Sequence, residues 1–306
     1  MTWEFEEVAG PIAGGLGGMC WTGDTLLVSA VGEGVIYRCD PQTGALSEFR
    51  RYTNRTNGLG MDAAGNLYGC QEGSRRVIQF CDDGSAVTTE VRVEGRIHNH
   101  PNNLSIDRRG RIWFSDPHSD IPAPGPPLFP PLEWAAVLRL TRDSRREWGM
   151  KRMTHDTHAP RAVLVSADEK TLYVAEGTPR SPVRELRAYS ILDDGELRSY
   201  IVLQSFGADS RGAHRGIEGM CLDSGGNIVA CSGYHESGPG PVESAISPAG
   251  VVLESHPLPH DMPVSCCFGG NAALDVLYVT TSQGYLLKAA GTGRRGFARF
   301  ENGAAG

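Results

Sequence analysis

PNNLSIDRRGRIWFSDP, residues 101–117, consists of two short apolar runs on either side of an Asp-Arg-Arg-Gly turn. An aspartate that opens a tight turn and a glycine after the bend are typical of a β-hairpin, because glycine tolerates a positive φ. The stretch therefore predicts two antiparallel strands, and Leu104 and Ile106 belong to the first of them.

The first half of this stretch recurs along the chain. Six segments align as one phrase: LGGMCW (16–21), TNGLGMD (56–62), PNNLSID (101–107), PRAVLVS (160–166), IEGMCLD (217–223) and VSCCFGG (264–270). Each is followed by a second apolar run, then a third, and often a fourth. The second residues of successive phrases lie 40 to 59 residues apart, close to the length of a four-stranded propeller blade. We predict an all-β, six-bladed β-propeller with four antiparallel strands per blade, forming a single domain over residues 1–306. Residues 3–8 are predicted to add the outer strand of the last blade and close the ring.

The composition of the chain excludes several classes of function. The net charge of −7 argues against a nucleic-acid-binding surface. No apolar run is long enough to span a membrane, and the N-terminal MTWEFEEVAG lacks an export signal. We therefore expect a cytoplasmic protein that acts on a small molecule, with its oligomeric state open. No nucleotide-binding motif is present, so no nucleotide cofactor is expected. The 8 cysteines form no CxxC pair and are expected to be buried as small hydrophobic residues.

Strand direction predicts where the functional residues gather. In an antiparallel blade, the start of the first strand and the end of the second lie on the same face. The second residues of the six phrases should therefore form a ring at one mouth of the central channel: Gly17, Asn57, Asn102, Arg161, Glu218 and Ser265. The same rule predicts all nine histidines on this face. The longest loop there, residues 117–134, is expected to act either as a lid or wall or as a passive insertion.

Longer motifs carry a family resemblance. They are TNGLGMDAAGNLYGCQEGSRRV (56–77), HPNNLSIDRRGRIWFSDP (100–117), SADEKTLYVAEG (166–177), IEGMCLDSGGN (217–227) and CFGGNAALDVLYVTT (267–281). With these motifs the chain resembles the SMP-30/gluconolactonase/luciferin-regenerating-enzyme family over nearly its whole length. The resemblance implies a six-bladed propeller that hydrolyses a lactone with one divalent cation, commonly calcium, in the channel mouth. Some members of the family cleave organophosphates instead.

The ring departs from what the resemblance implies. The family's cation ligands are a Glu in the first phrase, Asn in the third and fourth, and Asp in the fifth. Asn102 matches, and Glu218 conservatively replaces Asp, but Gly17 and Arg161 are not metal ligands. Calcium prefers six to eight oxygen ligands with several carboxylates, and Arg161 adds a permanent positive charge. We hypothesise that the calcium is absent and that Arg161 pairs with Glu218.

Two metal-bound alternatives remain open at this stage. If a divalent cation does bind, Glu218 and Asn102 are its expected ligands. A histidine-rich site for zinc, iron or manganese could instead combine Glu218 with His98, His100 or His214.

If no metal binds, the candidate residues have other roles in catalysis. Arg161 would stabilise an oxyanion or hold a substrate carboxylate, and a base would be supplied by Glu218, His100, His118 or His214. Pairing with Arg161 should lower the pKa of Glu218, which favours a histidine. Asp116, at the end of a second strand, is a further catalytic candidate or a strand-end cap. The predicted substrate-binding residues are Asn57, Asn102, Asn103, Ser265, Trp134 and Tyr234. Trp134, Tyr234, Leu128 and Phe129 would favour an apolar or aromatic cyclic substrate.

Three functions follow in order of preference. The first is a hydrolase that opens a lactone or related cyclic ester. The second is a metal-independent lyase, isomerase or cyclase that uses Arg161, Glu218 and a histidine. The third is a non-catalytic binding propeller, because a fold does not determine a function.

Overall fold

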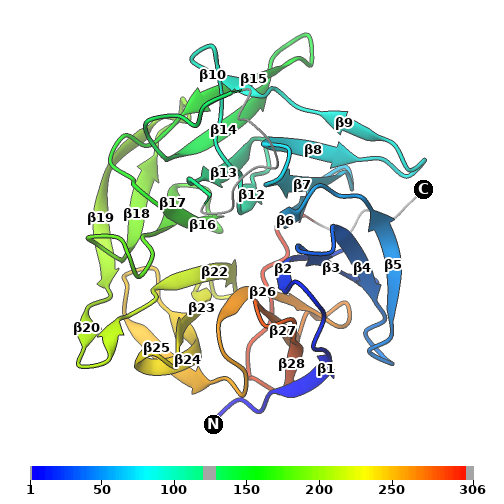
Figure 1. Cartoon of the computed structure of the whole chain (residues 1–306), viewed down its shortest axis with the longest axis vertical. Helices are drawn as coiled ribbons and strands as arrows, with labels where there is room; N and C mark the ends of the chain where they lie inside the picture. The colour runs from blue at the N-terminus through cyan, green and yellow to red at the C-terminus, as the bar shows by residue number, and fades with distance from the viewer. Residues whose placement is uncertain (1, 120–128, 301–306) are drawn as a thin grey trace.

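The computed structural model describes residues 2–119 and 129–300. Over these residues, six four-stranded antiparallel sheets are arranged around a common axis, as Figure 1 shows. The predicted all-β, six-bladed propeller is confirmed. No helix long and apolar enough to cross a membrane occurs in the described part of the chain.

In blades 1 to 5, four consecutive strands pair in chain order. The strands of blades 1 to 3 are β2 (Leu16–Trp21), β3 (Leu26–Ala30), β4 (Val35–Cys39), β5 (Leu46–Arg51), β6 (Thr56–Met61), β7 (Leu67–Gln71), β8 (Arg76–Phe80), β9 (Ala86–Thr88), β12 (Leu104–Ile106), β13 (Ile112–Asp116), β14 (Ala136–Arg142) and β15 (Trp148–Arg152). Those of blades 4 and 5 are β16 (Pro160–Val165), β17 (Thr171–Glu176), β18 (Glu185–Ile191), β19 (Leu197–Ser205), β22 (Ile217–Leu222), β23 (Ile228–Tyr234), β24 (Ser237–Ile246) and β25 (Val252–Pro257). Two short hairpins, β10 (Arg92–Val93) with β11 (Arg96–Ile97) and β20 (Ala208–Asp209) with β21 (Gly212–Ala213), lie in connections between blades.

Blade 6 is completed by the N-terminus, as predicted. Its strands are β26 (Pro263–Gly269), β27 (Val276–Thr281), β28 (Leu286–Ala290) and β1 (Glu6–Ala9), and β1 pairs with β28. Trp3 precedes the strand instead of beginning it. Its ring stacks on His256 at 4.2 Å, and its backbone N–H donates to His256 Nδ1 at 3.1 Å. The prediction that every histidine lies in a loop on the mouth face is therefore wrong for His256, which lies within β25.

The Asp–Gly turn of the repeated phrase owes its stability to one carboxylate. Asp107 Oδ1 accepts hydrogen bonds from the backbone of Arg109 and Arg111, both at 3.0 Å, and Asp107 Oδ2 accepts from Trp113 Nε1 at 2.9 Å. Gly110 takes a φ of 72°, where a side chain would be strained. Asp62 and Asp223 make the equivalent backbone bonds in blades 2 and 5.

The hydrophobic core lies between neighbouring blades. Between blades 3 and 4, for example, Trp113 and Val137 of one blade pack with Val163 and Leu172 of the other, and all four side chains are buried. Each blade buries apolar area against the next, so the order of the blades is fixed around the ring.

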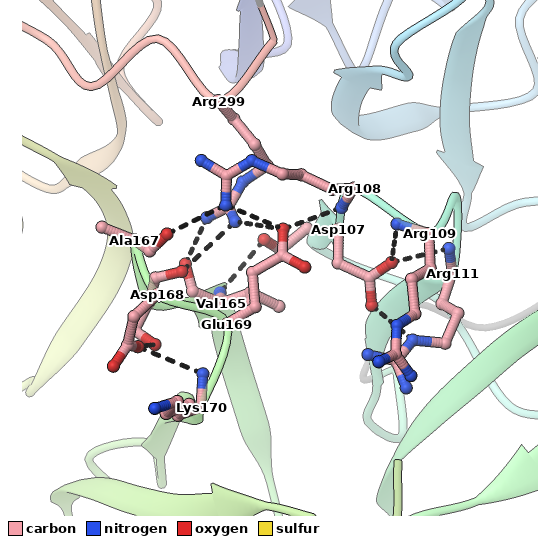
Figure 2. Close-up of polar contacts among 12 residues, drawn as sticks. Asp107, Arg108, Arg109, Arg111, Val165, Ala167, Asp168, Glu169, Lys170 and Arg299 are labelled. Carbon is pink, nitrogen blue, oxygen red and sulfur yellow. Dashed lines mark hydrogen bonds and ion pairs between the residues drawn. The ribbon is translucent and has the colours of Figure 1, made fainter. Parts of the chain in front are cut away.

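The segment after β28, residues 291–300, crosses the end of the propeller opposite the mouth; we call it the C-terminal strap. Its backbone bonds to blade 6 through Gly296 N and Leu274 O (2.8 Å) and to blade 5 through Phe297 N and Leu222 O (3.0 Å). Figure 2 shows Arg299 of the strap reaching the turns of blades 3 and 4, where it bonds to Glu169 at 3.1 Å.

The contacts of the strap predict that Arg299 stabilises the folded protein. We expect Arg299→Ala to lower the free energy of unfolding by about 1–3 kcal/mol, because it removes the hydrogen bonds of a largely buried guanidinium to Glu169 and to two backbone carbonyls. Arg295→Ala is the matched control: that side chain is exposed, and a change within about 0.5 kcal/mol is expected. Urea denaturation of both variants measures the difference. Equal stabilities would show that the strap does not depend on Arg299.

Candidate active site

A cavity of about 510 Å³ opens at the predicted mouth of the propeller. Five of the six ring positions line it: Gly17, Asn57, Asn102, Arg161 and Glu218. At the sixth position, Val264 lines the cavity in place of the predicted Ser265. The strand pairing shifts between Pro263 and Ser265, as it does between Ile217 and Gly219 in blade 5. Val264 is therefore the equivalent of Glu218, and the sixth phrase begins one residue earlier than predicted.

Bulges at this level are a general feature of the mouth. The pairing of the first strand with the second also shifts at Leu16–Met19, Thr56–Leu59, Pro160–Val163 and Ile217–Gly219. β-bulges bend a strand and redirect its side chains, and they are frequent beside active sites. The bulges explain why the ring residues point into the cavity, although the residues that follow them in the same strands alternate between the two faces of the sheet.

The predicted ion pair occupies the centre of the mouth. Arg161 Nη2 lies 2.9 Å and Arg161 Nε 3.0 Å from Glu218 Oε2. A second guanidinium approaches from the other side, where Arg215 Nε lies 3.5 Å from Glu218 Oε1. Glu218 and Arg215 are buried, with 4% and 7% of their side chains exposed. One carboxylate is therefore held between two arginines.

This environment determines the charge of Glu218. Burial by itself raises the pKa of the carboxyl, but Arg161 and Arg215 outweigh burial, so that the pKa of Glu218 lies below its ordinary value. Glu218 is therefore ionised near neutral pH, and it is a poor general base. The predicted direction of the shift is confirmed.

Gly17 stands where the resemblance implies a glutamate, and its surroundings exclude one. A Cβ atom at Gly17 would lie 2.5 Å from Asn57 Oδ1 and 2.6 Å from Val31 Cγ2. Asn57 is held there because its Oδ1 accepts a hydrogen bond from Gly18 N at 3.2 Å. The asparagine side chain thus fills the space of the missing carboxylate.

The donor chemistry of the mouth does not fit calcium. The single ring carboxylate is already engaged by two guanidiniums, whereas calcium needs several anionic or carbonyl oxygens directed at one point. The histidine-rich alternative is not assembled either. His98 bonds to Asp116, and His214 stacks on Phe206. Within residues 2–119 and 129–300, the one cluster of Cys, His, Asp and Glu with ligand-like spacing lies elsewhere.

His100 lines the cavity beside Asn102. Its Nδ1 lies 3.1 Å from the backbone oxygen of Glu72. A carbonyl can only accept a hydrogen bond, so Nδ1 carries the proton and Nε2 keeps a lone pair that can accept one. His118 also lines the cavity; its Nε2 donates to Leu132 O at 2.8 Å. Both histidines are therefore placed to accept a proton.

Two predicted catalytic residues, His214 and Asp116, do not line the mouth cavity. His214 is absent from the cavity wall; its Nδ1 accepts from Gly216 N, and burial followed by the charge of Arg184 lowers its pKa. Asp116 is fully buried and bonds to His98 Nδ1 at 2.9 Å and to Asn99 N at 2.6 Å. The carboxylate of Asp116 thus fixes the loop that carries His100.

The predicted substrate-binding residues beyond the ring contact other parts of the protein. Asn103 Oδ1 accepts from Val163 N at 3.1 Å and links blades 3 and 4. Trp134 packs under the guanidinium of Arg152, 3.9 Å from its ring centre, and the Tyr234 hydroxyl bonds to Ala213 O. None of the three lines the cavity.

The long loop can be described only in part. Phe129 is exposed and does not line the mouth cavity. Leu128 and the rest of residues 120–128, half of the predicted lid, lie outside the described residues.

The sequence-based prediction missed several charged residues of the wall, namely Arg55, Glu72, Arg180 and Arg215. Glu72 accepts hydrogen bonds from Arg55 at 3.2 Å and from Ser119 at 2.7 Å. It directly follows the second strand of blade 2, so the strand-direction rule could have identified it. Arg215 lies in the loop that enters blade 5, three residues before Glu218, where the same rule applies.

Comparison with known proteins agrees with this architecture. The sequence profile of the SMP-30/gluconolactonase/LRE-like region matches residues 17–283. A gluconolactonase of Zymomonas mobilis is 26% identical over 225 residues, which cover 70% of this chain and 58% of that protein. The chain thus spans little more than half the length of this relative.

Solved structures are also similar. A gluconolactonase from Xanthomonas campestris superimposes with a TM-score of 0.76 at 27% identity, covering 94% of this chain and 89% of that one. The calcium-binding protein regucalcin from Agrobacterium tumefaciens has a TM-score of 0.72 at 13% identity, with 98% and 96% covered. At that identity the likeness to regucalcin shows the fold alone.

The buried ion pair predicts a pH-dependent stability difference. At pH 7, Glu218→Gln should lower the free energy of unfolding by about 3–5 kcal/mol, because it leaves two arginines facing each other without a counter-charge. The folded-state pKa of Glu218 is lowered, so its stabilising contribution is present above the unfolded-state pKa and is lost as pH falls through the folded-state pKa. The difference between wild type and variant should therefore shrink below about pH 4.

Denaturant titrations at pH 7 and at successively lower pH measure this difference. Glu236→Gln is the matched control, because Glu236 is exposed. A wild-type advantage that is constant down to pH 2, or one of equal size in the control pair, would contradict the assignment.

Proposed function

The chain belongs to the SMP-30/gluconolactonase/LRE-like family, and we propose that it hydrolyses a lactone or related cyclic ester at the mouth cavity without a metal ion. One observation carries the proposal: the cavity joins a fixed cationic group, Arg161 held by Glu218, with a histidine whose Nε2 accepts a proton. The chain's similarity to gluconolactonases supports the reaction class.

In the proposed mechanism, His100 Nε2 takes a proton from a water molecule as the water oxygen attacks the lactone carbonyl carbon. Negative charge develops on the carbonyl oxygen, and the Arg161 guanidinium stabilises it. The tetrahedral intermediate then collapses, and the bond between the acyl carbon and the ring oxygen breaks. The leaving alkoxide takes the proton from the imidazolium, which gives a hydroxy acid and restores His100. Glu218 keeps Arg161 in place and takes no part in proton transfer.

The charges of the wall favour an anionic substrate. Among the described residues, four arginines and two glutamates line the cavity: Arg55, Arg161, Arg180, Arg215, Glu72 and Glu218. A wall rich in guanidinium groups suits a substrate that carries a carboxylate or phosphate besides the ester, because guanidinium binds both groups bidentately. The described wall contains no Phe, Tyr or Trp, so it lends no support to the expectation of an aromatic substrate. We propose a polar, negatively charged lactone.

A lyase or isomerase differs from a hydrolase in that it does not incorporate a water molecule into the product. Hydrolysis in ¹⁸O-labelled water places one labelled oxygen in the product carboxylate, whereas a lyase or isomerase incorporates none. A binding propeller turns over no cyclic ester at all. A panel of neutral and anionic lactones, followed by mass spectrometry, distinguishes these alternatives, and we expect incorporation with an anionic substrate.

Catalysis by Arg161 predicts a loss of activity that metal removal does not reproduce. Arg161→Ala should lower kcat/KM by about 10²–10³-fold, because the developing oxyanion loses its cation. The wild-type enzyme should keep its activity in excess EDTA. Arg145→Ala, which changes an exposed arginine, is the control and should leave activity unchanged. Loss of activity in EDTA, restored by calcium, would contradict the proposal.

The variant His100→Asn tests whether His100 is the base, independently of the role of Arg161. We expect kcat to fall by about 10²–10⁴-fold with an unchanged fold, whereas His155→Asn, at an exposed position, should behave as wild type. Steady-state rates with thermal unfolding as a fold check give the result. Full activity in His100→Asn would transfer the role of base to His118.

A further inference from the structure

Glu243 is buried in the apolar interface between blades 5 and 6. None of the residue is exposed, and neither carboxylate oxygen has a hydrogen-bond partner among the described residues. Its directly paired neighbours are Cys231 on β23 and His256 on β25. Cys231 belongs to an apolar cluster that includes Val229, Leu277 and Cys266. A buried carboxylate without a partner is costly, so its presence requires an explanation.

Neighbouring groups of the protein do not supply the partner. His256 is engaged by Trp3 N and lies 3.2 Å from Glu254 Oε2. The Cys266 thiol is close enough to the carboxylate to lower its pKa slightly, but it forms no hydrogen bond of ordinary geometry with it. Burial raises the pKa of Glu243 to about 8, which reflects the lack of compensation for the charged form.

Two cysteines converge on this carboxylate. Ligand atoms of Cys231, Cys266 and Glu243 all lie within 4.8 Å of one another. Cys266 is also in contact with the thiol of Cys221. The three residues come from three strands, β23, β24 and β26, of two blades. Two thiols and a carboxylate at this spacing form three corners of a tetrahedral metal site.

We propose that Cys231, Cys266 and Glu243 bind one thiophilic divalent cation, and that Cys221 is the fourth donor. Zinc fits this donor set, because it accepts thiolate and carboxylate ligands in one tetrahedral sphere. On binding, the thiols release their protons and coordinate as thiolates. Arg215, whose charge acts on Cys231, offsets part of the negative charge of the ligands.

The site has a route of entry. Gly219 lies opposite Cys231 in the sheet, and a Cβ there would lie 2.3 Å from Val264 O and 3.0 Å from Cys231 Sγ, so glycine lets blade 6 pack closely against the thiol. Cys221 and Cys266 line a second cavity, of about 910 Å³, which the C-terminal strap also lines. A cation can therefore reach the thiols from the end opposite the mouth. This site is separate from the proposed catalytic residues, so the inference does not depend on the lactonase proposal.

Elemental analysis tests the inference. Protein purified without chelator, then dialysed against metal-free buffer, should retain about one zinc per chain. Cys231→Ser and Glu243→Gln should each reduce that content at least about tenfold. Cys70→Ser, at a buried cysteine outside the cluster, should retain it. Glu218→Gln should retain it as well, which separates this site from the mouth.

A second measurement does not depend on whether the variants fold. Wild-type protein refolded with Co²⁺ in place of Zn²⁺ should show a thiolate-to-cobalt charge-transfer band and the visible absorption of tetrahedral cobalt. Absence of zinc in the isolated protein, together with no cobalt spectrum after refolding, would overturn the proposal. So would zinc that persists in both Cys231→Ser and Glu243→Gln, or zinc that is lost in Glu218→Gln.

Discussion

The ion pair between Arg161 and Glu218 organises the mouth of this propeller. Six blades direct their first strands at one point, so any charge placed there needs compensation from a neighbouring blade. Arg161 of blade 4 and Arg215 next to blade 5 compensate Glu218. The family resemblance implies a cation in this position, and here guanidiniums provide the positive charge. Asn57 fills the remaining space beside Gly17, so the arrangement is complete without a further carboxylate.

The rest of the site depends on how the blades hold that centre. Bulges at the start of the first strands turn the ring residues inward. Buried Asp116 fixes the loop through His98 and Asn99, and the carbonyl of Glu72 fixes the tautomer of His100. Rigid placement of a cation and an acceptor nitrogen around one cavity is what acyl transfer requires. At the opposite end, the strap and the cysteine cluster connect blades at positions outside the mouth cavity.

The sequence predicted the fold well because a propeller repeats one local pattern. Turn residues such as Asp107 and Gly110 and the spacing of the phrases were sufficient for six blades. The Arg161–Glu218 pair was predictable because both residues occupy equivalent positions in neighbouring blades. Ser265 was misplaced because the sixth phrase begins one residue earlier than predicted, and a shift of one residue reverses the facing of a strand.

Contacts between segments that are far apart in the chain could not be predicted from the sequence. Both carboxylate oxygens of Asp116 form hydrogen bonds with a buried loop. The position of Asp116 at a strand end does not reveal these contacts. Cys231, Glu243 and Cys266 look like unrelated interior residues until the sheet pairing and the blade interface bring them together. Calorimetric titration of the wild-type protein with Ca²⁺ tests most directly our proposal that guanidiniums take the place of calcium at the mouth. We expect no saturable binding heat up to millimolar calcium. Stoichiometric binding in the micromolar range that disappears in Glu218→Gln would contradict it.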